Sequence, residues 1–185
     1  AETKVASVDM KKLFNGYYKT KLAQSSLENR KLELRKEIKE MADNLEKSQA
    51  NYKQLLDQSS DPAVSSEERE KRKQAAADKA KEIASSRGAI EQFQRQAEAQ
   101  LADQSQRMSV NLVNEIQKAV ADKAKAGGFS LVLNSALNET VVYASNENDL
   151  TAAVLDQLNV GAPIDLPSTP GTGLRYPPRP IPRRG

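Results

Sequence analysis

Histidine, cysteine and tryptophan are all missing from this chain of 185 residues. Without cysteine there is no disulfide framework and no thiolate metal site. Without histidine the chain also lacks the commonest general base of enzymes, and the missing thiol removes one class of nucleophile. Glycine-rich phosphate loops, a G-x-S-x-G context and EF-hand spacing are absent as well. We therefore expect no enzyme, no cofactor and no metal site.

Aromatic residues are scarce, and no apolar run approaches the roughly 18 residues of a membrane span. With 4% aromatic and 29% charged residues, the composition suits long exposed helices better than a thick globular core. The net charge of +3 comes from residues 160–185, which carry four arginines and one aspartate. The rest of the chain is neutral overall, so nucleic-acid binding by the folded part is the least favoured class.

The chain opens with AETK and no methionine. A mature secreted chain looks like this after its signal peptide is cleaved at a small-residue site, and a chain trimmed at that point looks the same. We favour processing of a signal peptide.

Alternating apolar and polar residues predict short strands near both ends of the chain. The first is KVASVDM at residues 4–10, and two more are FSLVLN at 129–134 and TVVYAS at 140–145. A short helix follows, capped by Asn146 or Asn148, and ends near the start of the tail.

Two long helical patterns separate these strands. The first covers residues 11–58 and carries a heptad stripe typical of a coiled-coil seam, with Lys31 and Ser48 as its polar members. The apolar members of this seam are Leu27, Leu34, Ile38, Met41, Leu45, Tyr52 and Leu55. Pro62 then predicts a turn within residues 57–66, and Ser65 or Ser66 caps the next helix.

The second helix, residues 67–126, has a weaker seam. Its apolar members are Ile83, Ile90, Ala97, Leu101 and Met108, and Arg87, Gln94 and Gln104 interrupt it. Gly88 lies in the middle of this helix and is either a hinge or a tolerated helix glycine. Two glycines at 127 and 128 end the helix.

Two long helices joined by a turn predict an antiparallel hairpin, which brings the strands at its two roots into one small sheet. The expected fold is α+β, with a hairpin arm at residues 19–111, roughly 65–70 Å long, on a small β-rich body of residues 1–18 and 112–159. Residues 160–185 hold seven of the eight prolines and are expected to be a disordered or polyproline-like tail. This tail either solubilises the chain or binds a proline-recognising domain.

The body is too small to bury much apolar surface, and its sheet has open edges, so we expect a closed homo-oligomer. The candidate oligomerisation residues are apolar residues of the strands and the last helix: Val5, Val8, Phe129, Leu131, Val132, Leu133, Val141, Val142, Tyr143 and Leu155.

The stretches KVASVDMKKLF, GFSLVLNSALNETVVYAS and NDLTAAVLDQLN resemble the Skp/OmpH-like family of periplasmic chaperones. They match its first strand, its C-terminal hairpin and its closing helix, and the likeness in layout covers residues 4–159. The resemblance implies a jellyfish-like homotrimer whose arms enclose a cavity. There it would hold unfolded outer-membrane proteins in the periplasm without ATP. The tail after residue 160 departs from the family pattern.

An alternative function is that of a structural coiled-coil adaptor with one folded partner. An adaptor should have an uninterrupted seam, whereas this seam is broken by polar residues, which favours the chaperone. Residues 11–40 carry nine basic residues and four glutamates, so this part either attracts acidic clients or lipid head groups or is simply a solvated face. The resemblance also implies contact with a membrane surface or lipopolysaccharide, but no basic residue here matches the family's contact residues individually.

Overall fold

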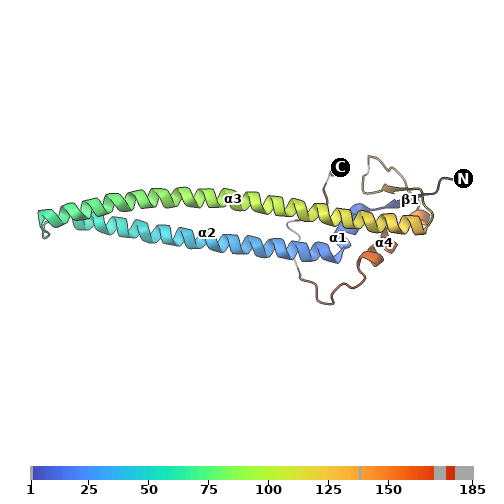
Figure 1. Cartoon of the computed structure of the whole chain (residues 1–185), viewed down its shortest axis with the longest axis horizontal. Helices are drawn as coiled ribbons and strands as arrows, with labels where there is room; N and C mark the ends of the chain where they lie inside the picture. The colour runs from blue at the N-terminus through green and yellow to red at the C-terminus, as the bar shows by residue number, and fades with distance from the viewer. Residues whose placement is uncertain (1, 138, 169–173, 178–185) are drawn as a thin grey trace. The chain divides into compact units, whose positions relative to one another are not determined.

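The structure, a computed structural model, describes residues 2–137, 139–168 and 174–177. The elements follow the order β1 (Val5–Val8), α1 (Met10–Gly16), α2 (Tyr18–Ser59), α3 (Ser66–Ala126), β2 (Leu131–Asn134), a 3-10 turn (Asn146–Asn148) and α4 (Thr151–Leu158) (Figure 1). They form two compact units, which we call the body unit (residues 1–29 and 102–185) and the hairpin unit (residues 30–101). The α+β class, with long helices and a small sheet, is confirmed.

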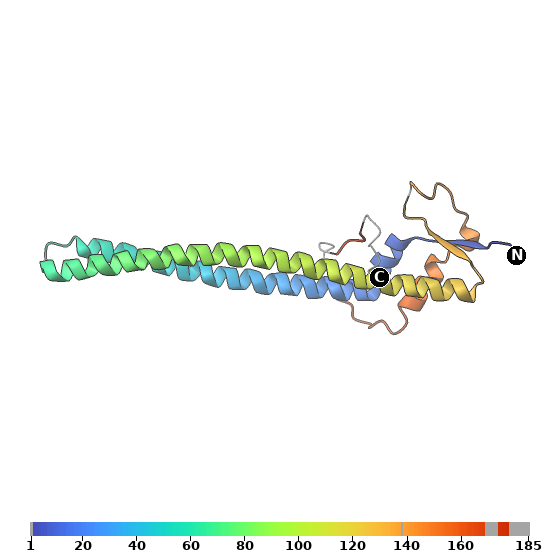
Figure 2. The same ribbon diagram turned by 45° about the horizontal axis from the view of Figure 1, so that its top comes forward.

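Strand β1 is the centre of the body unit. It pairs in parallel with β2, and the two strands lie together near the N-terminus in Figure 2. In the register of this pair Val5 lies opposite Leu131. On its other side Ser7 bridges to Asp149, and the Leu150 amide donates a hydrogen bond to the Ser7 carbonyl. The prediction that the two ends of the chain share one sheet is therefore confirmed.

The strand predicted at residues 140–145 is wrong for the single chain. The structure has turns and irregular backbone there, and the amides of Thr140 and Val141 both bond back to the carbonyl of Leu137. A strand needs a neighbour to receive its backbone hydrogen bonds. Both sides of β1 are occupied, by β2 and by the Asp149 bridge, and residues 140–145 do not pair with the outer edge of β2 either, so no strand receives their backbone hydrogen bonds in the described part of the chain.

The first helical pattern is divided into two helices. Tyr17 separates α1 from α2 with an extended backbone at ψ 127°. Gly16 precedes it, and a Cβ on Gly16 would lie 3.0 Å from both methyl carbons of Leu155 in α4. This close approach of α1 to α4 bends the chain where periodicity alone predicted a continuous helix.

In the hairpin unit, α2 and α3 run side by side in opposite directions and are joined by the turn at residues 60–65 (Figure 1). Ser48 bonds to Glu82 across them. The predicted seam of α2 is confirmed, because its members are buried or half-buried. The seam of α3 is shifted by one residue at two places, since Ser86 and Phe93 are half-buried whereas Arg87 and Gln94 are exposed.

The helix ends are mostly those the sequence predicted. Ser65 caps α3 by accepting a hydrogen bond from the Glu68 amide, and Gly128, with a φ of +72°, follows its last turn. The predicted asparagine cap of α4 is wrong. Asp149 accepts hydrogen bonds from the Thr151 amide and hydroxyl instead, since Asn146–Asn148 already form the 3-10 turn.

The expected tail is described only at residues 160–168 and 174–177, and its remaining prolines and arginines lie outside the described residues. Ile164 is fully exposed, as a disordered tail would have it. Leu174 differs from that expectation, because it is only 4% exposed and packs in the body unit. Residues 174–177 thus contact the body unit, and the disorder expected of the tail stays a prediction.

Candidate functional site

Several exposed apolar side chains lie on β2 and on the segment that follows it. Val142 is 92% exposed and Tyr143 is 84% exposed, while Leu131, Leu133 and Leu137 are each exposed by more than a third. The outer edge of β2 has no neighbouring strand among the described residues. Soluble domains rarely leave apolar side chains and an open strand edge together, so this region has the properties of an interaction surface.

The ten predicted oligomerisation residues fall into three groups. Val5, Leu131, Leu133, Val142 and Tyr143 are exposed and available to another chain. The half-buried members are Phe129, Val132, Val141 and Leu155. Val8 is only 2% exposed and belongs to the chain's own core, so it is not available for contact with another copy.

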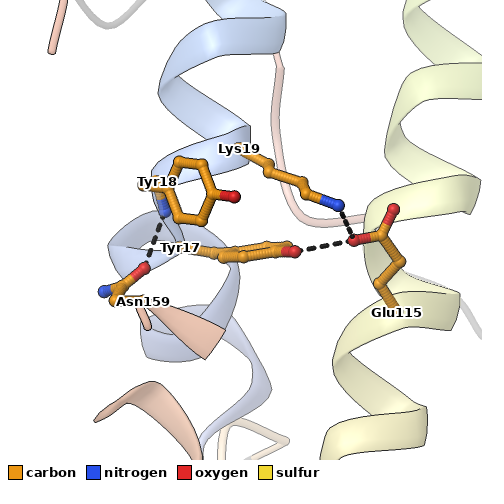
Figure 3. Close-up of polar contacts among 5 residues, drawn as sticks. All are labelled: Tyr17, Tyr18, Lys19, Glu115 and Asn159. Atoms are coloured by element: carbon orange, nitrogen blue, oxygen red, sulfur yellow. Dashed lines mark hydrogen bonds and ion pairs between the residues drawn. The ribbon is translucent and has the colours of Figure 1, made fainter. Parts of the chain in front are cut away.

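A polar cluster joins α1, α2, α3 and α4 inside the body unit (Figure 3). The Tyr17 hydroxyl donates a 2.6 Å hydrogen bond to Glu115 Oε2, and the Lys19 ammonium donates a 2.8 Å hydrogen bond to the same oxygen. Asn159, just after α4, accepts a hydrogen bond from the Tyr18 amide and donates one to the Gly16 carbonyl. The break between α1 and α2 is thus held by Glu115 of α3 and by Asn159 after α4.

The charges of this cluster support its hydrogen bonds. Burial and the hydrogen bond to Glu115 raise the pKa of Tyr17 to about 12, so the phenol remains a donor. The hydrogen bond to Glu115 also raises the pKa of Lys19, and the bond from Lys19 lowers the pKa of Glu115. Each group stays in the protonation state that makes the contact, so the cluster is a clamp with no proton to transfer.

An open groove of about 350 Å³ lies between α2 and α3 in the body unit. Its lining residues are Tyr18, Lys19, Leu22, Ala23, Met108, Asn111 and Leu112. Most of this lining is apolar and mixes aromatic, aliphatic and thioether side chains, which adapt to ligands of different shape. The groove can take an apolar side chain without specifying a single partner.

Sequence reasoning missed this groove, although a signal for it exists. Tyr18 and Leu22 lie one helical turn apart on α2, and Met108 and Leu112 lie one turn apart on α3. Periodicity assigns Met108 to the seam of the second helix and gives no role to Leu22. Leu22 is nevertheless 39% exposed, which packing alone does not explain.

The model of the OmpH-like outer membrane protein family matches residues 4–158. The chain belongs to this family. OmpH-like proteins are periplasmic chaperones without enzymatic activity, which gives the chain a chaperone role in general. No curated protein matches the chain.

The OmpH-like match ends where α4 ends, so the Pro- and Arg-rich segment is an addition to the family's part of the chain. In the described residues no group of three or more acidic side chains is placed to hold a metal ion. No helix of that same part is long and apolar enough to cross a membrane.

Proposed function

We propose that the chain is an ATP-independent holding chaperone of the periplasm. It assembles as a homotrimer and holds unfolded outer-membrane β-barrel proteins between its helical hairpins. The observation that carries this proposal is the family match over residues 4–158. The trimer, the clients and the cavity between the hairpins are its finer parts, and the features of the body and hairpin units support each of them.

The exposed apolar residues of the body unit support self-association. Val142 and Tyr143 follow a turn after β2, and the outer edge of β2 is open among the described residues. A second copy that places its residues 140–145 against this edge would complete a strand pair and cover both side chains. Such a contact is heterologous, and repeated heterologous contacts form a closed ring when the rotation between neighbouring copies closes. The proposed trimer is a ring of this kind.

The hairpin unit supports weak, unspecific holding. Ion pairs between residues three or four positions apart, such as Lys39 with Asp43 and Arg72 with Glu68, line its surface. Exposed pairs of this kind contribute about 0–1 kcal/mol each and leave the surface well hydrated. Half-buried apolar residues such as Met41 and Phe93 lie among them. Several such surfaces around one client multiply weak contacts through effective concentration.

The test is light scattering coupled to size exclusion, after dilution of a urea-unfolded outer-membrane β-barrel protein into the purified chain. The proposal expects about three times the protomer mass of 20.3 kDa plus one client chain. Aggregated client beside a bare oligomer would remove the holding function and favour the adaptor. A complex of one client with a single protomer would support the holding function and contradict the trimer.

A further inference from the structure

The segment Leu174–Pro177, which lies outside the family match, is docked on the body unit. Leu174 is buried, and the Tyr176 ring packs edge-on against Phe14 of α1, with centroids 6.0 Å apart. Arg175 between them is exposed. Alternate residues therefore face the protein, as in any extended peptide that lies along a surface.

Three elements that are distant in sequence build the site under this segment. Gln24 of α2 donates a 3.3 Å hydrogen bond to the Leu174 carbonyl. Asn134, at the end of β2, donates a 3.2 Å hydrogen bond to the Tyr176 hydroxyl. Phe14 supplies the aromatic surface. The site thus binds one backbone carbonyl and one tyrosine through hydrogen bonds, and it buries one aliphatic side chain.

The site is formed by groups that the fold itself holds in place. Asn134 Oδ1 accepts hydrogen bonds from the amides of Met10 and Ala136, which fixes its side-chain amide with the nitrogen toward Tyr176. Phe14, on α1, is fully buried in the body unit. A preorganised site binds a peptide with little additional ordering of its own side chains.

We propose that this is a docking site for an extended segment with an aliphatic residue followed, two positions later, by an aromatic one. The chain's own Leu174–Tyr176 segment occupies it until an unfolded client supplies the same pattern. The client class rests on the proposed function. Strands of outer-membrane barrels alternate apolar and polar residues and carry aromatic girdles at both ends of the apolar band. They therefore present aliphatic and aromatic residues two positions apart.

Because the Leu174–Tyr176 segment is part of the same chain, it competes with every other segment for the docking site. Fifteen positions of the sequence, 159–173, separate the end of α4 from Leu174, so the segment is covalently attached to the chain that carries its site, and attachment through a short linker gives an effective concentration in the millimolar range. A free peptide with one matching motif competes poorly against that concentration. A long unfolded client that also contacts other surfaces competes well, so the tail would bias the body toward unfolded chains over short peptides.

The test uses the full chain and a fluorescein-labelled peptide with the sequence of residues 172–178, TGLRYPP. In the double variant Leu174→Ser/Tyr176→Ser the site is vacant, and fluorescence anisotropy should show binding at least 10-fold tighter than to the unchanged chain. Ile164→Ser is the matched control, because it removes an aliphatic side chain of the same tail that is fully exposed. It should bind the peptide as weakly as the unchanged chain does. Circular dichroism verifies the fold, and Tyr176→Ser alone replaces the double variant if that variant unfolds.

Client competition completes the test. A peptide copied from a barrel strand with a Leu-x-Tyr pattern should displace the label from the double variant, and its Ser-x-Ser version should not. Equal label binding to all chains, no binding to any of them, or displacement by both strand peptides would overturn the proposal. So would a change of oligomer mass on displacement, since the segment would then dock between copies. If the unchanged chain holds a whole unfolded client but the label never binds, the docking site fails and the holding function stands. If no client is held, the proposed function fails by itself.

Discussion

The Tyr17 hydroxyl and the Glu115 carboxylate lie 98 positions apart in the sequence and are joined by a 2.6 Å hydrogen bond. This contact fixes the start of α2 against α3 at the point where the chain leaves α1. Lys19 shares the same carboxylate oxygen, so one acidic side chain holds two donors from α2 and the residue before it. The clamp connects the two distant segments that make up the body unit.

Replacing Tyr17 with Phe should lower the free energy of unfolding by about 1 kcal/mol at pH 7, because the Glu115 carboxylate loses one of its two donors. The pKa of Tyr17 is raised from 10.0 to about 12 in the folded state. Its contribution is therefore fully present below pH 10 and is lost as the pH rises from 10 to about 12. Urea unfolding at several pH values should show the difference between the two proteins shrinking over that window.

Glu115, the acceptor in the same cluster, makes stability depend on pH in the opposite direction, because its pKa is lowered and not raised. Its contribution to the free energy of unfolding is present above the ordinary carboxyl value of 4.5 and is lost as the pH falls below it.

The control for Tyr17→Phe is Tyr52→Phe, which changes a half-buried tyrosine of the hairpin unit. A pH-independent loss in Tyr17→Phe, equal to that of the control, would contradict the clamp.

Gly16→Ala should destabilise the chain by about 1–3 kcal/mol, because its Cβ would lie 3.0 Å from two Leu155 carbons. Helix propensity alone favours alanine, so the sign of the effect separates a steric contact from local preference. Combining it with Leu155→Ala should recover part of the loss in thermal unfolding. Additive losses in the double variant would show that the two side chains do not meet.

Gly88→Ala should have the opposite effect. Gly88 lies inside an unbroken α3, and a Cβ there would meet no atom within 4 Å. Alanine should therefore raise the free energy of unfolding by about 1 kcal/mol. The hinge hypothesis adds that this variant holds large unfolded clients less well, while Ser85→Ala, at a neighbouring exposed position, does not. Unchanged holding would leave Gly88 as a tolerated helix glycine.

Periodicity predicted those features that depend on local pattern. The α2 seam through Leu34 and Met41, the turn at Pro62 and the pairing of β1 with β2 all follow from apolar spacing, turn chemistry and the connection of the hairpin. The identity of the family added the chaperone role. The missing histidine and cysteine led only to the expectation that the chain is no enzyme.

The missed features depend on contacts between distant residues. The break at Tyr17 follows from the approach of α1 to α4, and no local pattern in residues 10–20 encodes it. The docking of Leu174 depends on Gln24 and the site around it, whereas the prolines near it predicted disorder. The site's polar cluster was missed for the same reason, because Glu115 is one of many charged residues on α3 until the fold places it beside Tyr17.

The irregular conformation of residues 140–145 leads to the last prediction. This segment has strand-like composition, yet Val142 is 92% exposed and no strand of the described chain pairs with it. If a second copy supplies the neighbour, a charge at this position would be buried without a partner, which is strongly unfavourable. Val142→Asp should therefore shift the mass measured by light scattering toward the 20.3 kDa protomer. Val160→Asp, at an exposed position just after α4, should leave the oligomer intact. An oligomer that survives Val142→Asp, or dissociates equally in both variants, would exclude these residues from the interface and return attention to the open edge of β2 and its exposed Leu131 and Leu133.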